Sequence, residues 1–122
     1  MEIVKLEIPK KSEYISTIRL TTSALSNIIG FNIDDIEDIK VIISEICTFF
    51  ISNIKLNEKP LLFEFISEVN SLNVTVTDLN DGEITEENKK NSEMCILIIE
   101  SLADDYNINL VENKLNFKKF LK

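Results

Sequence analysis

Residues 44–50, with the sequence SEICTFF, contain a single carboxylate, that of Glu45, inside a segment with a helical pattern of apolar residues. One helical turn later the chain has Phe49. Side chains at positions i and i+4 lie on the same face of a helix, so both would reach one point in space. A carboxylate there could act as a general base, whereas a phenyl ring offers no oxygen to a hard cation. The segment is therefore a functional site, the remnant of one, or a buried helix.

The composition excludes several classes of function. The chain has 122 residues, of which 44% are apolar, so it can bury one packed core, and we expect a single domain over residues 1–122. Its net charge of −8, from 21 acidic and 13 basic residues, argues against direct binding of nucleic acid or of an anionic membrane. The chain has no histidine, which excludes histidine-based acid–base catalysis and the common zinc sites.

The distribution of apolar residues and cysteines predicts a cytoplasmic protein. No apolar run reaches the roughly 18 residues that a membrane-spanning helix needs. The first residues, MEIVKLEIPKK, mix charged and apolar side chains and lack the apolar stretch of a signal peptide. Cys47 and Cys95 both lie in apolar, helical surroundings, so we expect two reduced core thiols rather than a disulfide or a redox site.

Hydrophobic periodicity predicts a two-layer α+β sandwich. Ser12 is a candidate N-cap for the first helix, and residues 78–93 are polar and predict a surface loop. The order β-α-α-β-β-α-β-β places three helices on one face of a mostly antiparallel sheet. We expect strands at 2–8, 61–68, 71–77, 106–112 and 114–121, and helices at 13–29, from 32–34 to about 55, and at 94–104.

Three segments resemble the bacterial anti-sigma-factor serine kinases: EYISTIRLTTSALSN (13–27), IEDIKVIISEICT (36–48) and IIESLADDYNI (98–108). These kinases belong to the GHKL superfamily, whose members share the ATP-binding fold of histidine kinases, Hsp90 and DNA gyrase. The resemblance is dense over the first 55 residues and poor between 78 and 97, and it returns in the third helix and the final hairpin. The element order expected from periodicity is also the order of that fold.

The resemblance implies a role for Glu45. In the family, the second helix carries Ser-Glu-x-x-x-Asn, in which the glutamate is the general base and the asparagine binds the magnesium that bridges the phosphates. Ser44 and Glu45 match the first half of this motif, but Phe49 stands at the asparagine position. The resemblance therefore implies that Glu45 is a vestigial base, that Phe49 fills the vacated space, and that no metal ligand remains. The alternative is that Glu45 still works as a base.

Two further motifs of the family are incomplete. Asp78 matches the aspartate of Asp-x-Gly-x-Gly, which binds the adenine amino group, whereas Asn80 replaces the first glycine and Gly82 matches the second. Asp78 could hold adenine, or it could be an ordinary residue at a strand end; Gly82 would bind nucleotide only in a retained site. The phosphate-binding glycine-rich segment corresponds to residues 92–96, which contain no glycine and include Glu93.

These losses predict a regulatory binding protein rather than a kinase. Arg19 matches a family arginine that contacts both the sigma factor and the antagonist protein. The resemblance thus implies a sigma factor or a STAS-type anti-anti-sigma protein as partner, and a homodimer formed through the first strand and helix. We expect no cofactor. The alternatives are an active serine kinase that uses ATP and magnesium with Glu45 and Asp78, and a structural or sensory protein without a ligand.

Overall fold

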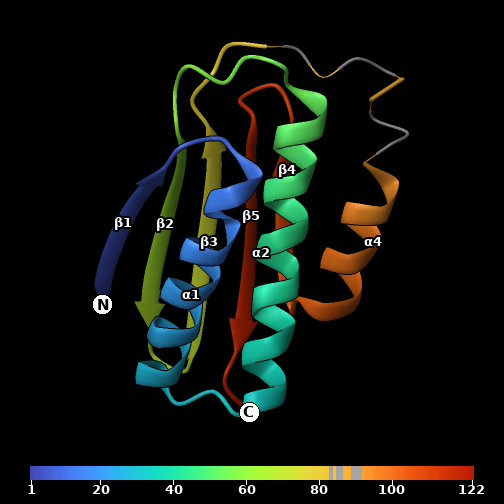
Figure 1. Cartoon of the computed structure of the whole chain (residues 1–122). Helices are drawn as coiled ribbons and strands as arrows, with labels where there is room; N and C mark the ends of the chain where they lie inside the picture. Colours follow the sequence, from blue (N-terminus) through green and yellow to red (C-terminus); the bar gives the residue numbers. More distant parts are fainter. Residues whose placement is uncertain (83, 85–86, 89–91) are drawn as a thin grey trace.

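The computed structural model describes residues 1–82, 84, 87–88 and 92–122, and it confirms the two-layer α+β sandwich. The strands form one sheet in the order β1-β2-β3-β5-β4, and every neighbouring pair is antiparallel. The helices α1, α2 and α4 lie against one face of this sheet (Figure 1). The strands are β1 (Glu2–Ile8), β2 (Leu61–Glu68), β3 (Ser71–Asp78), β4 (Asp105–Asn109) and β5 (Lys114–Phe120), and the helices are α1 (Ile15–Ile29), α2 (Ile33–Asn53) and α4 (Glu93–Leu102).

The start of the first helix differs from the prediction. A short 3-10 helix, η1 (Ser12–Tyr14), precedes α1, and Ser12 lies inside η1 instead of capping α1. Tyr14 stands at the N-cap position with a near-helical φ of −95° and makes no side-chain capping bond. The chain thus enters α1 through a 3-10 turn, and a side-chain cap, which needs extended backbone at the N-cap, is not formed.

The second helix follows the prediction closely. Gly30 ends α1 in the left-handed conformation, with φ of +107°, which glycine adopts without steric cost. Asn32 then caps α2, because its side chain accepts a 2.8 Å hydrogen bond from the backbone N–H of Asp35. The predicted apolar stripe of α2 is buried along its whole length and faces the sheet; it consists of Ile36, Ile39, Ile43, Ile46, Phe50 and Ile54.

The alternation along β3 gives the sheet one apolar and one polar face, as predicted. Leu72, Val74 and Val76 are buried in the core, whereas Asn73 and Thr75 are half-buried on the opposite face. Because side chains of a strand alternate between faces, Asp78, two residues after Val76, lies on the same core-facing side of the sheet. The sheet therefore delivers the predicted site aspartate to the helical layer.

The C-terminal elements are shorter than predicted. The strand expected at 106–112 is β4, Asp105–Asn109, and a turn that ends at Asn113, with φ of +55°, leads into β5. The predicted loop 78–93 begins with the last residue of β3; its positions 83, 85–86 and 89–91 lie outside the described residues. Within the parts of the chain that the structure describes, none of the helices combines the length and the apolar character needed to span a lipid bilayer.

The cap of α2 gives the first testable prediction. We expect Asn32→Ala to lower the free energy of unfolding by about 1 kcal/mol, because the N–H of Asp35 loses its acceptor. Urea denaturation followed by circular dichroism measures this change. Asn27→Ala, at an exposed position inside α1, is the matched control and should not destabilise the protein. An equal loss in both variants would contradict the capping role.

Candidate functional site

The side chain of Asp78 is buried against a lysine. Asp78 ends β3, and its side chain is 0% exposed. Its Oδ2 lies 2.8 Å from the Nζ of Lys10, whose side chain is 1% exposed. Lys10 follows the end of β1, which pairs with β2 so that Ile8 lies opposite Leu61, and Leu61 in turn lies opposite Asp78. The strand register thus brings the lysine and the aspartate to the same edge of the core.

Lys10 also binds the backbone that follows α2. Besides the ion pair, its Nζ donates hydrogen bonds to the carbonyl oxygens of Ile54 and Leu56, the latter at 2.8 Å. These carbonyls follow the end of α2, where no helical N–H is left to bond them. The buried charge of Lys10 is therefore neutralised by Asp78 and solvated by two carbonyl groups.

Asn80 satisfies the other carboxylate oxygen of Asp78. The Oδ1 of Asp78 accepts hydrogen bonds from the backbone N–H of Asn80 at 3.0 Å and from its Nδ2 at 2.8 Å. The side-chain amide of Asn80 also binds the backbone of Lys59: its Nδ2 donates to the carbonyl oxygen at 2.7 Å, and its Oδ1 accepts from the N–H at 2.8 Å. We refer to Lys10, Asp78 and Asn80 as the Asp78 cluster. Oδ1 of the carboxylate thus accepts two hydrogen bonds from Asn80, and Oδ2 lies in the ion pair with Lys10.

Sequence reasoning missed Lys10. It identified Asp78 and noted that Asn80 stands where a glycine was expected, but a lysine after Pro9, beside a second lysine, resembles a solvent-exposed residue. One signal could have pointed to it. An aspartate kept at a buried strand end, beside a side chain too large for ligand approach, needs a cation from elsewhere in the chain.

Glu45 and Phe49 share one face of α2, as predicted from their spacing. Both line a groove of about 290 Å³ between α2 and α4, together with Met94 and Cys95. Glu45 is half-buried, and it forms no hydrogen bond or ion pair with the described part of the chain. None of the residues of the Asp78 cluster lines this groove.

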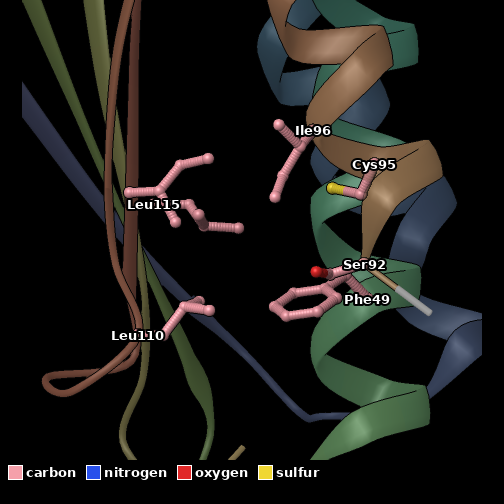
Figure 2. A pocket seen from close by; sticks show the side chains of 7 residues that line it. Phe49, Ser92, Cys95, Ile96, Leu110 and Leu115 are labelled. Atoms are coloured by element: carbon pink, nitrogen blue, oxygen red, sulfur yellow. The ribbon is translucent and has the colours of Figure 1, made fainter. Parts of the chain in front are cut away.

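The ring of Phe49 occupies the space between α2, α4 and the final hairpin. Its side chain is buried, and its ring lies 5.4 Å from that of Phe50. Figure 2 shows the ring pointing from α2 towards Leu110, with Cys95 and Ile96 of α4 above it. The cavity left among these side chains is about 10 Å³, roughly the size of one water probe. The prediction that Phe49 fills a pocket therefore agrees with its packing.

The two cysteines are free and buried, as expected. Burial raises the pKa of the Cys47 thiol from 9.0 to about 12, which makes its thiolate very scarce near neutral pH. Burial also raises the pKa of Cys95 to about 12, and the negative charge of Glu45 contributes to that rise. Neither thiol therefore has the low pKa of a nucleophilic cysteine.

Gly82 lines a surface hollow of about 650 Å³ together with Asp78 and Asn80, whereas Arg19 lies apart from it on α1. Gly82 packs tightly, since a Cβ there would lie 2.9 Å from the Cγ2 atom of Ile54, and its carbonyl accepts a 3.0 Å hydrogen bond from Asn113. This packing explains a glycine at the position without any ligand. Arg19 is exposed on α1. In the described residues, no group of three or more acidic, cysteine or histidine side chains is placed to hold a metal ion.

The sheet order, the helical layer and the placement of Glu45 and Asp78 define a GHKL-type fold. The chain belongs to the histidine kinase-like ATPase domain family, whose sequence profile matches residues 8–119. It is 45% identical over 47 residues to the serine-protein kinase RsbW of Halalkalibacterium halodurans, and 51% identical over 47 residues to those of Bacillus thuringiensis (strain Al Hakam) and Bacillus cereus (strain B4264). Each of these matches covers 38% of this chain and 29% of the relative. The resemblance to serine kinases is thereby confirmed over part of the chain.

The Asp78 cluster generates the second prediction. We expect Lys10→Met to lower the free energy of unfolding by about 3–5 kcal/mol, because it leaves a buried carboxylate without its cation. Asp78→Asn should destabilise for the converse reason. The double variant should lose clearly less than the sum of the two, because neither charge is then left alone. Denaturant unfolding of all four proteins measures this coupling.

The control for this cycle is Lys5→Met. Lys5 lies 3.8 Å from Glu64 on the surface, and its side chain is 64% exposed. An exposed pair of this kind contributes about 0–1 kcal/mol, so the control should be nearly as stable as the native protein. Additive losses in the Lys10 and Asp78 cycle would show that the two charges do not interact.

Proposed function

We propose that this protein is an anti-sigma-factor-like regulator that binds a sigma factor or a STAS-type anti-anti-sigma protein in the cytoplasm and has no kinase activity. It acts as one histidine kinase-like ATPase domain over residues 1–122. Membership of that family and the likeness to serine-protein kinases RsbW over 47 residues support this assignment.

The observation that carries the proposal is the engagement of both oxygens of the Asp78 carboxylate by Lys10 and Asn80. In the resembling kinases, the matching aspartate accepts a hydrogen bond from the adenine amino group. Adenine could take that place here only by displacing a buried ion pair and the Asn80 amide, each with a large desolvation cost. The residues present therefore do not fit an adenine ring.

The metal side of the site does not fit Mg²⁺-ATP either. Phe49 presents a buried hydrocarbon ring where the family has an amide oxygen, and Mg²⁺ needs oxygen ligands. Glu93 is exposed in the first turn of α4, at the helix end where a phosphate group would bind the backbone N–H groups. Its carboxylate would repel a phosphate. We therefore derive no catalytic step through a nucleotide.

The exposed face of α1 supports the partner-binding part of the proposal. Leu20 and Ile28, two turns apart, are 73% and 78% exposed, and Ala24 lies between them. Arg19 is also exposed, in the same turn of α1 as Leu20 but roughly 100° from it around the helix axis. An exposed apolar stripe on a helix that also carries an exposed arginine is typical of a protein-binding surface, because arginine and apolar side chains supply the well-packed anchors.

A homodimer is part of the same proposal. β1 pairs on one side only, with β2, so the backbone groups of its other edge are available. Ile3 and Val4 of this strand are exposed. Pairing with a second copy would cover this apolar edge.

A second candidate function is an active serine kinase with Glu45 as the general base and Asp78 as the nucleotide ligand. One observation favours it: Glu45 lines an open groove of about 290 Å³ and has no partner in the described residues. A base must be accessible to its substrate, and Glu45 meets that requirement. The engaged state of Asp78 speaks against this candidate.

Co-elution with candidate sigma factors and STAS proteins tests the proposal. We expect one of them to bind the native protein at submicromolar affinity. The Arg19→Glu variant should bind that partner at least about tenfold more weakly, because the substitution reverses the charge at the interface. Lys11→Glu, the same charge change at another exposed residue near α1, is the matched control and should bind normally. Absence of any such partner would contradict the regulator. Transfer of phosphate from Mg²⁺-ATP to a bound STAS protein, lost in Glu45→Gln, would establish the kinase instead.

A further inference from the structure

The groove between α2 and α4 is lined by two chemically different sets of side chains. Phe49, Met94 and Cys95 give it an apolar wall, and Met94 is 64% exposed. Glu45, Thr48 and Ser52 line it from α2, and their spacing of three and four residues places them in one row. A volume of about 290 Å³ is enough for one or two long side chains but small for a drug-sized ligand.

The polar row has hydrogen-bond capacity that the protein does not use. Neither Thr48 nor Ser52 forms a hydrogen bond to the described part of the chain. Other hydroxyls of the same helical layer behave differently: Ser44 donates to the carbonyl of Lys40 at 2.8 Å, and Thr22 to that of Ile18 at 2.7 Å. The two groove hydroxyls are therefore free to accept from a ligand.

In the residues that the structure describes, no cation pairs with Glu45. The cation of α2 one turn before it, Lys40, pairs with Glu37 at 3.0 Å instead. The carboxylate lies near the apolar wall, since its charge is felt by the Cys95 thiol. In a chain with a net charge of −8, a half-buried carboxylate without a partner attracts a cation from outside.

We infer that the groove holds a lysine side chain of a protein partner, with its ammonium at Glu45 and Thr48 and its methylene stem against Phe49, Cys95 and Met94. The fit is both electrostatic and stereochemical. Residues three apart on a helix are neighbours, so the carboxylate of Glu45 and the hydroxyl of Thr48 can both accept from one ammonium. A lysine stem buries its methylenes along apolar surface while the charged end stays at a polar rim. This inference rests on the proposed function, because it requires Glu45 to have no catalytic duty.

Small probes test the site without the unidentified partner. Nα-acetyl-L-lysine N-methylamide is titrated into the ¹⁵N-labelled full chain, and its uncharged analogue Nα-acetyl-L-norleucine N-methylamide serves as the matched ligand. We expect the lysine probe to shift the amide resonances of residues 45–52 and 94–95 with millimolar affinity, and the norleucine probe to bind at least about fivefold more weakly. Raised salt should weaken only the lysine probe.

Three variants localise the contact. Glu45→Gln should weaken the lysine probe at least about fivefold and make it equivalent to norleucine, because it removes the charge and keeps the shape. Met94→Ser, at an exposed position, should weaken both probes about two- to threefold by removing part of the apolar wall. Glu37→Gln, on the same helix but outside the groove, should change neither.

The outcomes separate this inference from the proposed function. Equal binding of both probes, or lysine binding that survives Glu45→Gln, overturns the lysine site while leaving partner binding through Arg19 intact. Displacement of the lysine probe by Mg²⁺-ATP overturns both, because the groove would then be a nucleotide site. Lysine-selective, Glu45-dependent shifts that are insensitive to Mg²⁺-ATP support the lysine site.

Discussion

The buried ion pair between Lys10 and Asp78 connects three parts of the chain that are distant in sequence. Lys10 follows β1 and binds the carbonyls of Ile54 and Leu56 after α2, and Asp78 ends β3. Removing two charges from water is costly, and it is offset only when every donor and acceptor is satisfied. Here the ammonium has two carbonyl acceptors beside the ion pair, and Oδ1 of the carboxylate accepts two hydrogen bonds from Asn80. The segment between α2 and β2 is thus fixed by Lys10 and Asn80, which bind the backbone of Ile54, Leu56 and Lys59.

Phe49 likewise fills space in the core, beside the groove that Glu45 lines. A ring at this position contributes to the core between α2, α4 and the final hairpin, and it leaves a void of only about 10 Å³. Dense packing stabilises the fold through many small contacts, so Phe49 contributes to the stability of the core. The scaffold keeps the α+β sandwich and the exposed face of α1 while its interior is filled by its own side chains.

The sequence predicted the structure well wherever the periodicity of apolar residues selects a helix or a strand. The stripe of α2 and the alternation of β3 predicted both elements and their buried faces, because burial of one face is what selects helix or strand. Local capping was less predictable. Ser12 does not cap α1 as predicted, since η1 changes the backbone conformation at the helix entrance, and the cap that Asn32 forms on α2 was not predicted. Such details depend on how the chain arrives from β1.

The residues of the candidate site differ in the same way in how far the sequence predicts their placement. Glu45 and Phe49 share a groove because their spacing on one helix places them there, which the sequence alone predicts. The partner of Asp78 depends instead on the register of β1, β2 and β3, which brings Lys10 alongside from 68 positions away. No local pattern marks a lysine that will be buried, so only the assembled sheet identifies it.

We propose that the chain's own side chains occupy the place of a nucleotide. Calorimetric titration of the native protein with Mg²⁺-ATP and with Mg²⁺-ADP measures this most directly. We expect no saturable heat with either nucleotide, because the Asp78 carboxylate is already bound and no magnesium ligand stands at Phe49. Micromolar binding that disappears in a folded Asp78→Asn protein would contradict it.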